Sequence, residues 1–168
     1  MAEFPTKSPG EVVTAADWNQ IEDYVESQPA PAAKMVASSS QSMLTGEIIT
    51  LAFGSGDVSF DNDGMADPAN NRLTVVTPGI YLVESGVRAD FTSGSRITQQ
   101  VRVNGTVVVT TLRAWEGGTD GATASTVVSV SAGDHITAVT FNTGSTQSTS
   151  PGFGMPFLSA VRLSGPPT

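Results

Sequence analysis

The chain has 168 residues, of which 39% are hydrophobic and only 14% are charged, and its formal net charge is −8. This length and composition predict one ordinary domain with a modest core and room for a small appendage. The acidic balance and scattered arginines argue against a nucleic-acid partner, the lack of a long apolar run argues against a membrane, and the absence of Cys excludes disulfides, zinc–thiolate sites and a Cys nucleophile.

Residues 1–13 read as an extended segment interrupted by prolines. They contain no apolar stretch followed by a small-residue cleavage site, so they do not resemble a secretory signal. We therefore expect the chain to be made in a cytoplasm and used without export through the secretory route.

The segment after it predicts one short amphipathic helix. Thr14 is a good N-cap residue, and Asp17 follows it at the spacing of a capping box. Four residues form an apolar stripe: Trp18, Ile21, Tyr24 and Val25. Because so short a helix is marginal alone in water, the stripe must dock, either on the chain's own β-domain or on a sister subunit or larger assembly. The Pro/Ala segment that follows favours the second.

Residues 29–34 (PAPAAK) read as a short, stiff linker between the N-terminal arm and helix (1–28) and a β-domain (35–165). Short Val/Thr/Ile runs separated by Gly, Asn, Asp and Pro predict ten strands in the domain. They lie near 34–41, 47–53, 57–60, 72–77, 80–91, 96–103, 106–115, 123–130, 135–142 and 157–163. Ten short strands predict an all-β fold, a ten-stranded antiparallel jelly-roll β-sandwich.

The clearest local signal is VRVNGTVVV (101–109), in which two β-branched runs flank Asn104-Gly105. Both turn residues tolerate positive φ, so the dipeptide predicts a type I′ hairpin turn.

Alternation is also clear in the long strand near 80–91. One face carries Tyr81, Val83, Val87, Ala89 and Phe91, and the other carries Glu84, Arg88 and Asp90. In the last strand, Phe157, Val161 and Leu163 share a face.

The segment LTVVTPGIYLVESGVRA (73–89) resembles the signature of tumour-necrosis-factor-like jelly rolls, in particular the head of complement component q. Further similar segments follow in the family's order: AAKMVASSSQS (32–42), TGEIITLAF (45–53), RITQQVRVNG (96–105), STVVSVSAGDHITAVTF (125–141) and MPFLSAVRL (155–163). The chain lacks a collagen-like stem and cysteine, and in this it is more similar to the version of the fold in phage and bacterial particle proteins.

The resemblance implies a homotrimer, in which three jelly rolls pack around a threefold axis. Four aromatic residues are candidates for the trimer interface: Tyr81, Phe141, Phe153 and Phe157. Burial in the core of a single sandwich explains each of them equally well.

Asp61-Asn62-Asp63-Gly64, with Asp67 beyond it, is the densest group of oxygen ligands. Because Ca²⁺ prefers such ligands, Asp61, Asp63 and Asp67 are the candidates for a calcium site. An EF-hand loop would require Glu where the chain has Arg72, and a polar turn explains the group without a metal. We expect neither a metal nor a cofactor.

Catalytic constellations are missing. His135 is the only histidine, and no Gly-x-Ser-x-Gly segment accompanies it. Glu116 and Asp120 flank two glycines, a setting too flexible for a glycosidase pair. We therefore expect that the chain is not an enzyme.

From these observations we form the hypothesis that the chain is a structural protein of a bacteriophage particle. In this hypothesis a trimeric head is displayed on the virion surface, and residues 1–28 anchor it to capsid or tail proteins after synthesis in the host bacterial cytoplasm. The alternative is the receptor-binding head of a tail-fibre adhesin, which would recognise a host glycan or surface protein through loops near 61–71, 92–96, 116–123 and 143–153.

Overall fold

The computed structural model describes residues 14, 16–17, 29–91, 95–114, 118–152 and 156–165, except for the side chains of 90–91 and 118–120. The chain divides into two compact units, Met1–Ala30 and Pro31–Thr168. We call the second unit the head.

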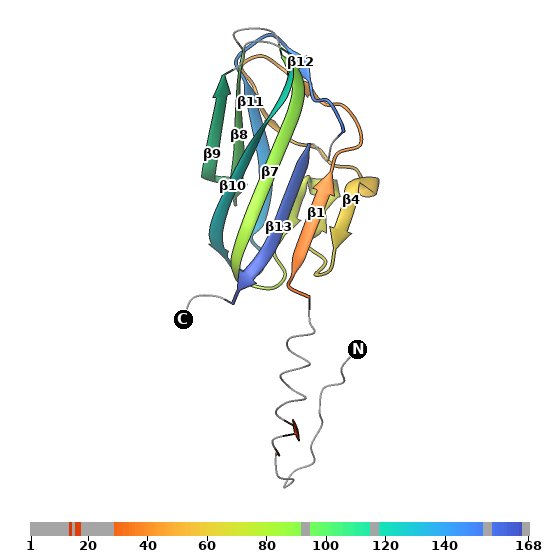
Figure 1. Ribbon diagram of the computed structural model, residues 1–168, viewed down its shortest axis with the longest axis vertical. Helices are drawn as coiled ribbons and strands as arrows, with labels where there is room; N and C mark the ends of the chain where they lie inside the picture. The colour runs from red at the N-terminus through yellow and green to blue at the C-terminus, as the bar shows by residue number, and fades with distance from the viewer. Residues whose placement is uncertain are drawn as a thin grey trace. The chain divides into compact units, whose positions relative to one another are not determined.

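One layer of the head is an antiparallel five-stranded sheet, which faces the viewer in Figure 1. Its order is β10-β7-β13-β1-β4. The strands span Ala32–Val36 (β1), Val58–Asp61 (β4), Gly79–Phe91 (β7), Gly118–Val130 (β10) and Phe157–Ser164 (β13). The first and last strands of the head are therefore neighbours in this sheet.

The other layer is an antiparallel sheet ordered β5-β6-β11-β8-β9, with β3 paired to β11. Its strands span Ile48–Thr50 (β3), Ala66–Asp67 (β5), Arg72–Thr74 (β6), Arg96–Val103 (β8), Thr106–Ala114 (β9) and His135–Asn142 (β11). A small ladder joins Ser42–Met43 (β2) to Gln147–Ser148 (β12), and single 3₁₀ turns cover Ser55–Asp57 (η1) and Pro68–Asn70 (η2).

The predicted jelly-roll sandwich is confirmed, and each of the ten expected ranges holds a strand. The sequence pattern did not predict β2, β5 and β12, which have two residues each and are too short for alternation to show. Strand β1 begins at Ala32, inside the range expected to be a linker. The reason is that Ala32 and Ala33 are buried and pair with Val161 and Ala160 of β13.

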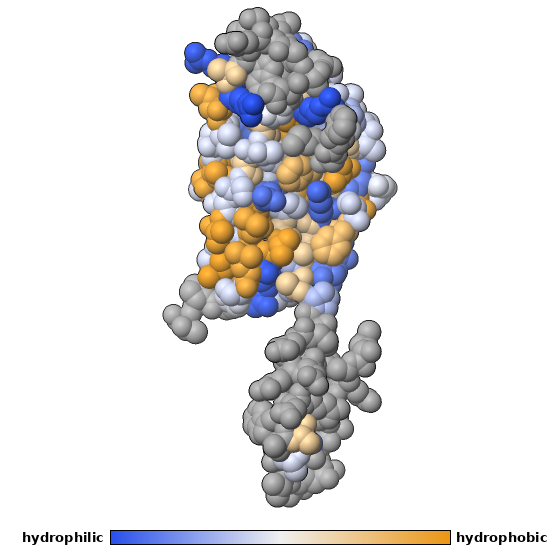
Figure 2. Space-filling model, viewed as in Figure 1, coloured by the Kyte–Doolittle hydropathy of each residue, from blue (hydrophilic) through white to orange (hydrophobic). Residues whose placement is uncertain are grey.

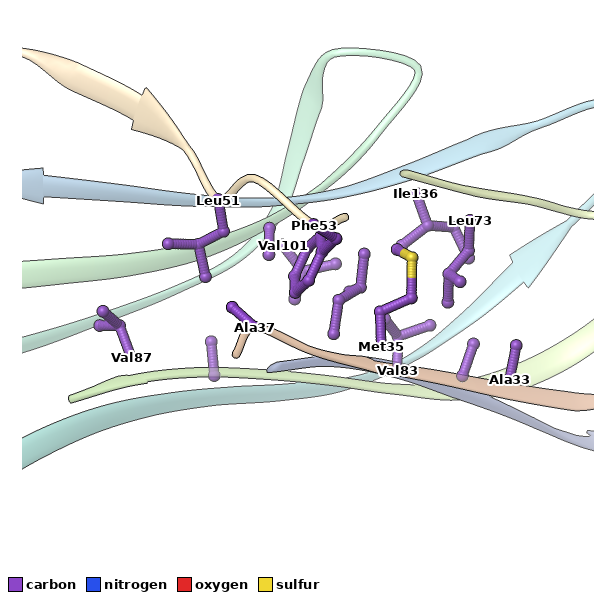
Figure 3. Packing of buried hydrophobic residues seen from close by; sticks show 14 of the residues in the cluster. Ala33, Met35, Ala37, Leu51, Phe53, Leu73, Val83, Val87, Val101 and Ile136 are labelled. Atoms are coloured by element: carbon purple, nitrogen blue, oxygen red, sulfur yellow. The ribbon is translucent and has the colours of Figure 1, made fainter. Parts of the chain in front are cut away.

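The core lies between the two layers. Met35, Val83 and Leu158 enter it from the five-stranded sheet, and Leu73 and Ile136 enter from the other. Figure 3 shows the Met35 side chain pointing across the interior towards Ile136 and Leu73. Burial of each large side chain contributes about 1.5–3 kcal/mol. This core holds the faces of both sheets in place.

The β8–β9 hairpin has the predicted turn. Asn104 has a φ of 50° and Gly105 a φ of 81°, and Val103 pairs with Thr106 directly behind them. Two successive residues with positive φ are the hallmark of a type I′ turn.

In the N-terminal unit, the predicted capping box is present. The backbone N–H of Thr14 donates to Asp17 Oδ2 at 2.7 Å, and the N–H of Asp17 donates in return to Thr14 Oγ1 at 3.3 Å. The predicted stripe of Trp18, Ile21, Tyr24 and Val25 lies outside the described residues.

Candidate functional site: the outer face of the five-stranded sheet

The inner and outer faces of β7 follow the predicted alternation. Tyr81, Val83 and Val87 are buried, whereas Glu84 is exposed and Arg88 is partly exposed. The start of the strand departs from the pattern, because Ile80 and Leu82 lie on the outer side and are apolar as well. Four consecutive apolar residues (80–83) were the signal that this part of the sheet is apolar on both faces.

A row of aliphatic side chains crosses the outer face of the sheet. Val127 of β10, Leu82 of β7 and Val161 of β13 are direct cross-strand partners. Such neighbours lie about 5 Å apart and contact one another. Val127 is 58% exposed and Val161 is 40% exposed, so the row is turned towards solvent in the single chain.

Two more exposed apolar residues belong to this outer surface. Leu163 follows on β13 and is 55% exposed, and Phe60 lies on the edge strand β4 and is 47% exposed. Figure 2 shows hydrophobic residues gathered over the lower part of this side of the head. We call the set of Leu82, Val127, Val161, Leu163 and Phe60 the apolar face.

The next row of the sheet adds charge. Glu84 pairs with Ser159, Ser159 pairs with Lys34, and Lys34 pairs with Phe60. The Lys34 ammonium also lies over the Phe157 ring, 5.0 Å from its centroid, which is a favourable cation–π arrangement. A row that contains charges therefore borders the aliphatic row on one side.

The four aromatic candidates for the trimer interface are in different places. Tyr81 is fully buried and donates a hydrogen bond to the Thr77 carbonyl at 2.6 Å, so it belongs to the sandwich core and not to an outer interface. Burial raises the pKa of its hydroxyl. Phe141 lies half-buried on the other sheet, between Ile48 and Thr98. Phe157 is half-buried beside the apolar face, and Phe153 lies outside the described residues.

The acidic loop after β4 uses its carboxylates to hold itself together. Asp61 accepts hydrogen bonds from the backbone N–H groups of 63, 65 and 66, at 2.9 to 3.2 Å. Asp63 accepts from the N–H and the hydroxyl of Thr77. The three candidate calcium ligands thus face different partners, and within the described ranges no three His, Cys, Asp or Glu side chains gather as a metal site.

Asp67, the last of these candidates, forms an ion pair with Arg72, whose Nε lies 2.9 Å from Asp67 Oδ2. Hydrogen bonds from Asn70, and then from Arg72, hold the pKa of Asp67 below its usual value. Arg72 stands where a calcium loop of the EF-hand type would need Glu, and here it neutralises the carboxylate directly.

His135 lies half-buried at the start of β11, and its ring Nδ1 is 3.4 Å from the Thr74 hydroxyl. Of the described helical segments, none is both long enough and apolar enough to cross a membrane. The apolar face is the candidate functional site of the described chain.

Comparison with known proteins identifies the fold and leaves the function open. No family model matches the sequence, and no curated protein matches it. Among solved structures, the globular domain of zebrafish complement 1qA aligns with a TM-score of 0.59 at 10% identity, covering 80% of this chain and 98% of its own.

Murine APRIL aligns similarly. Its structure at pH 5.0 has a TM-score of 0.63 at 16% identity and covers 80% of this chain and 99% of its own. Its structure at pH 8.5 has a TM-score of 0.61 at 17% identity and covers 79% and 98%. The head thus has the jelly-roll fold shared by these two proteins, as the sequence resemblance implied. Identities this low establish the fold alone.

Proposed function

We propose that this chain is a self-assembling structural protein of a bacteriophage particle, with a head that forms a homotrimer through the apolar face. The observation that carries the proposal is the exposed row of Val127, Leu82 and Val161 on one side of the sandwich. Contiguous exposed apolar surface on a small head marks an interaction site.

The chemistry of the surface favours another protein as its partner. The aliphatic side chains in the lower part of the sheet would lose contact with water when a partner binds, which favours association. Glu84 and Lys34 in the next row carry charges of opposite sign that can fix the orientation of a partner. An apolar patch bordered by charges is typical of a protein interface. A second copy of the chain is always available as that partner.

Threefold assembly is the finer part of the proposal. In a threefold ring, the apolar face of each copy meets a different surface of its neighbour, and such head-to-tail contacts close when the rotation between copies closes. The sequence resemblance to the tumour-necrosis-factor-like family implies a ring of three.

The test compares two substitutions of equally exposed aliphatic residues by sedimentation. Val127→Glu places a charge on the apolar face, and Ile48→Glu places one on the other sheet, where Ile48 is 62% exposed. We expect the wild type and Ile48→Glu to sediment at about three times the chain mass, and Val127→Glu to sediment near 17.3 kDa. A wild-type monomer, or equal dissociation of both variants, contradicts the proposal.

Anchoring by residues 1–28 rests on the two-unit division and on the apolar stripe in the sequence. Among the residues that the structure describes, the hydrophobic core cluster extends from Ala33 to Ala160, so the head has a core of its own. We expect a chain without residues 1–28 to fold and assemble but to be absent from purified particles. Incorporation at wild-type occupancy contradicts an anchoring role.

The same truncated head distinguishes the adhesin alternative. A structural head is expected not to bind host cells, and particles without it are expected to attach normally. Saturable binding of the head to host cells, together with loss of attachment by particles that lack it, would replace the structural role with receptor recognition.

A further inference from the structure

Two turns are joined by hydrogen bonds at one end of the head. Asn104 lies in the β8–β9 turn, and Asp134 and His135 lie where β10 returns into β11. The N–H of Asn104 donates to the His135 carbonyl at 2.9 Å, and the N–H of His135 donates to Asn104 Oδ1 at 2.9 Å. Asn104 Nδ2 donates to Asp134 Oδ1 at 2.8 Å. We call these three bonds the turn clamp.

Asn104 and Gly105 also combine the requirements of a chemical modification. Both are exposed, Gly105 has no side chain to obstruct its backbone nitrogen, and this is the one Asn-Gly pair in the sequence. We propose that Asn104 is a site of non-enzymatic deamidation, that the turn clamp controls its rate, and that the product releases the clamp.

The reaction needs only water. The Gly105 backbone nitrogen attacks Cγ of Asn104, a C–N bond forms, the bond from Cγ to Nδ2 breaks, and ammonia leaves with the proton that Gly105 loses. Water then opens the five-membered imide at one of its two carbonyls, which yields aspartate or isoaspartate. No group is oxidised or reduced.

The clamp controls the first step through geometry. In the folded turn, both polar atoms of the Asn104 side chain are directed at the neighbouring turn, at 2.9 and 2.8 Å. Cγ can approach the Gly105 nitrogen only after these bonds break, so the reaction proceeds from a locally opened state. Its rate is then reduced by the small population of that state.

The product cannot rebuild the clamp. Aspartate at 104 has an acceptor where Nδ2 had its donor, and it would face the Asp134 carboxylate. Hydrogen bonds from the Ser131 N–H and then from Asn104 hold the pKa of Asp134 below its usual value, so Asp134 is ionised at neutral pH. Two like charges at hydrogen-bond distance repel. Isoaspartate also lengthens the backbone of a two-residue turn.

The rate is measured on the purified full-length chain at mildly alkaline pH, by peptide mapping of residue 104 in native and denatured samples. We expect Asn104 in the native chain to deamidate at about one tenth of the rate in the denatured chain, or more slowly still. Asp134→Ala removes the acceptor of Asn104 Nδ2 and should move the native rate towards the denatured one. Equal native and denatured rates, or no effect of Asp134→Ala, overturn control by the clamp.

The product is mimicked by Asn104→Asp. We expect this variant to lower the thermal midpoint by about 2–4 °C. The exchanged pair, Asn104→Asp with Asp134→Asn, restores one donor and one acceptor and should recover most of the loss. An unchanged midpoint in Asn104→Asp, or no recovery in the exchanged pair, overturns the claim that deamidation releases the clamp.

Discussion

The Phe157 ring lies against Gly86, its direct partner on the neighbouring strand of the five-stranded sheet. A Cβ at position 86 would lie 2.5 Å from ring Cε1, closer than real side chains approach each other. The absence of a side chain at position 86 therefore leaves the space that the aromatic ring occupies. The Lys34 ammonium group lies over the same ring.

Gly86→Ala should lower the free energy of unfolding by about 1–3 kcal/mol, because the ring must move or the strands must separate. The control is Gly56→Ala, since a Cβ there would meet no atom within 4 Å and the residue does not have a positive φ. Urea unfolding at one fixed protein concentration measures both. Equal midpoints for the two variants contradict this account of Gly86.

The hydrogen bonding of Gln99 leads to a second prediction, which compares the stabilities of two variants. It is fully buried between the sheets, and its Nε2 donates to Ser85 Oγ at 2.9 Å. Its Oε1 has no hydrogen-bond partner among the described residues. Ser85→Ala leaves both polar atoms of the amide unpaired and should cost about 1–3 kcal/mol.

Gln99→Met removes the orphaned oxygen together with the amide and should cost less than Ser85→Ala. Denaturant unfolding of the two variants, and of their combination, checks the order. A larger loss for Gln99→Met would mean that the amide contributes more than its single hydrogen bond to Ser85.

From the hydrogen bonds of the acidic loop we predict that Ca²⁺ does not change the thermal stability of the protein. Asp61, Asp63 and Asp67 are each occupied by different donors, so Ca²⁺ would have to displace those bonds to bind. A ligand that binds the folded state raises the thermal midpoint of the protein, by an amount that grows with the logarithm of the ligand concentration divided by Kd. We expect equal midpoints in millimolar Ca²⁺ and in chelator. A rise with Ca²⁺ that Asp63→Asn abolishes would support the calcium site that the sequence pattern suggested.

Asp57 predicts part of the pH dependence of stability. Burial is the largest influence on its pKa and raises it, but hydrogen bonds from Gly54 and Ser38 together outweigh burial, and the pKa lies below its usual value. A carboxyl with a lowered pKa in the folded state stabilises the fold above the pKa of the unfolded chain, about 3.9. That contribution is lost as the pH falls through the folded-state pKa.

Asp57→Asn should therefore be less stable than the wild type at pH 7, and the difference should shrink as the pH falls well below 4. Thermal midpoints of both proteins across this range are the measurement. A difference that is constant with pH would show that Asp57 acts through its shape and not through its charge.

Much of the fold was predictable because its signals are local. The turn at Asn104-Gly105 follows from backbone preferences of two residues, and the alternation of β7 places Tyr81 and Glu84 on opposite faces of the strand. The capping box of Thr14 and Asp17 is equally local. Such patterns need no knowledge of the other strands.

The candidate site was less predictable. Tyr81 and Phe157 are both aromatic residues in strands, and the sequence pattern around them does not show which one is buried. Tyr81 is buried because the second sheet covers its side of β7, whereas the Phe157 side of β13 faces outward. Leu82, Val127 and Val161 form a row only because β10 and β13 flank β7, a pairing between segments far apart in the chain.

The sequence by itself therefore determined the longer strands, the tight turn and the side of each strand on which a residue lies, since these depend on neighbours along the chain. The order of its segments indicated the jelly-roll class. Only the tertiary structure decided which side became core and which became the apolar face. The physical reason is that burial depends on what covers a sheet, and that covering comes from strands brought together by folding.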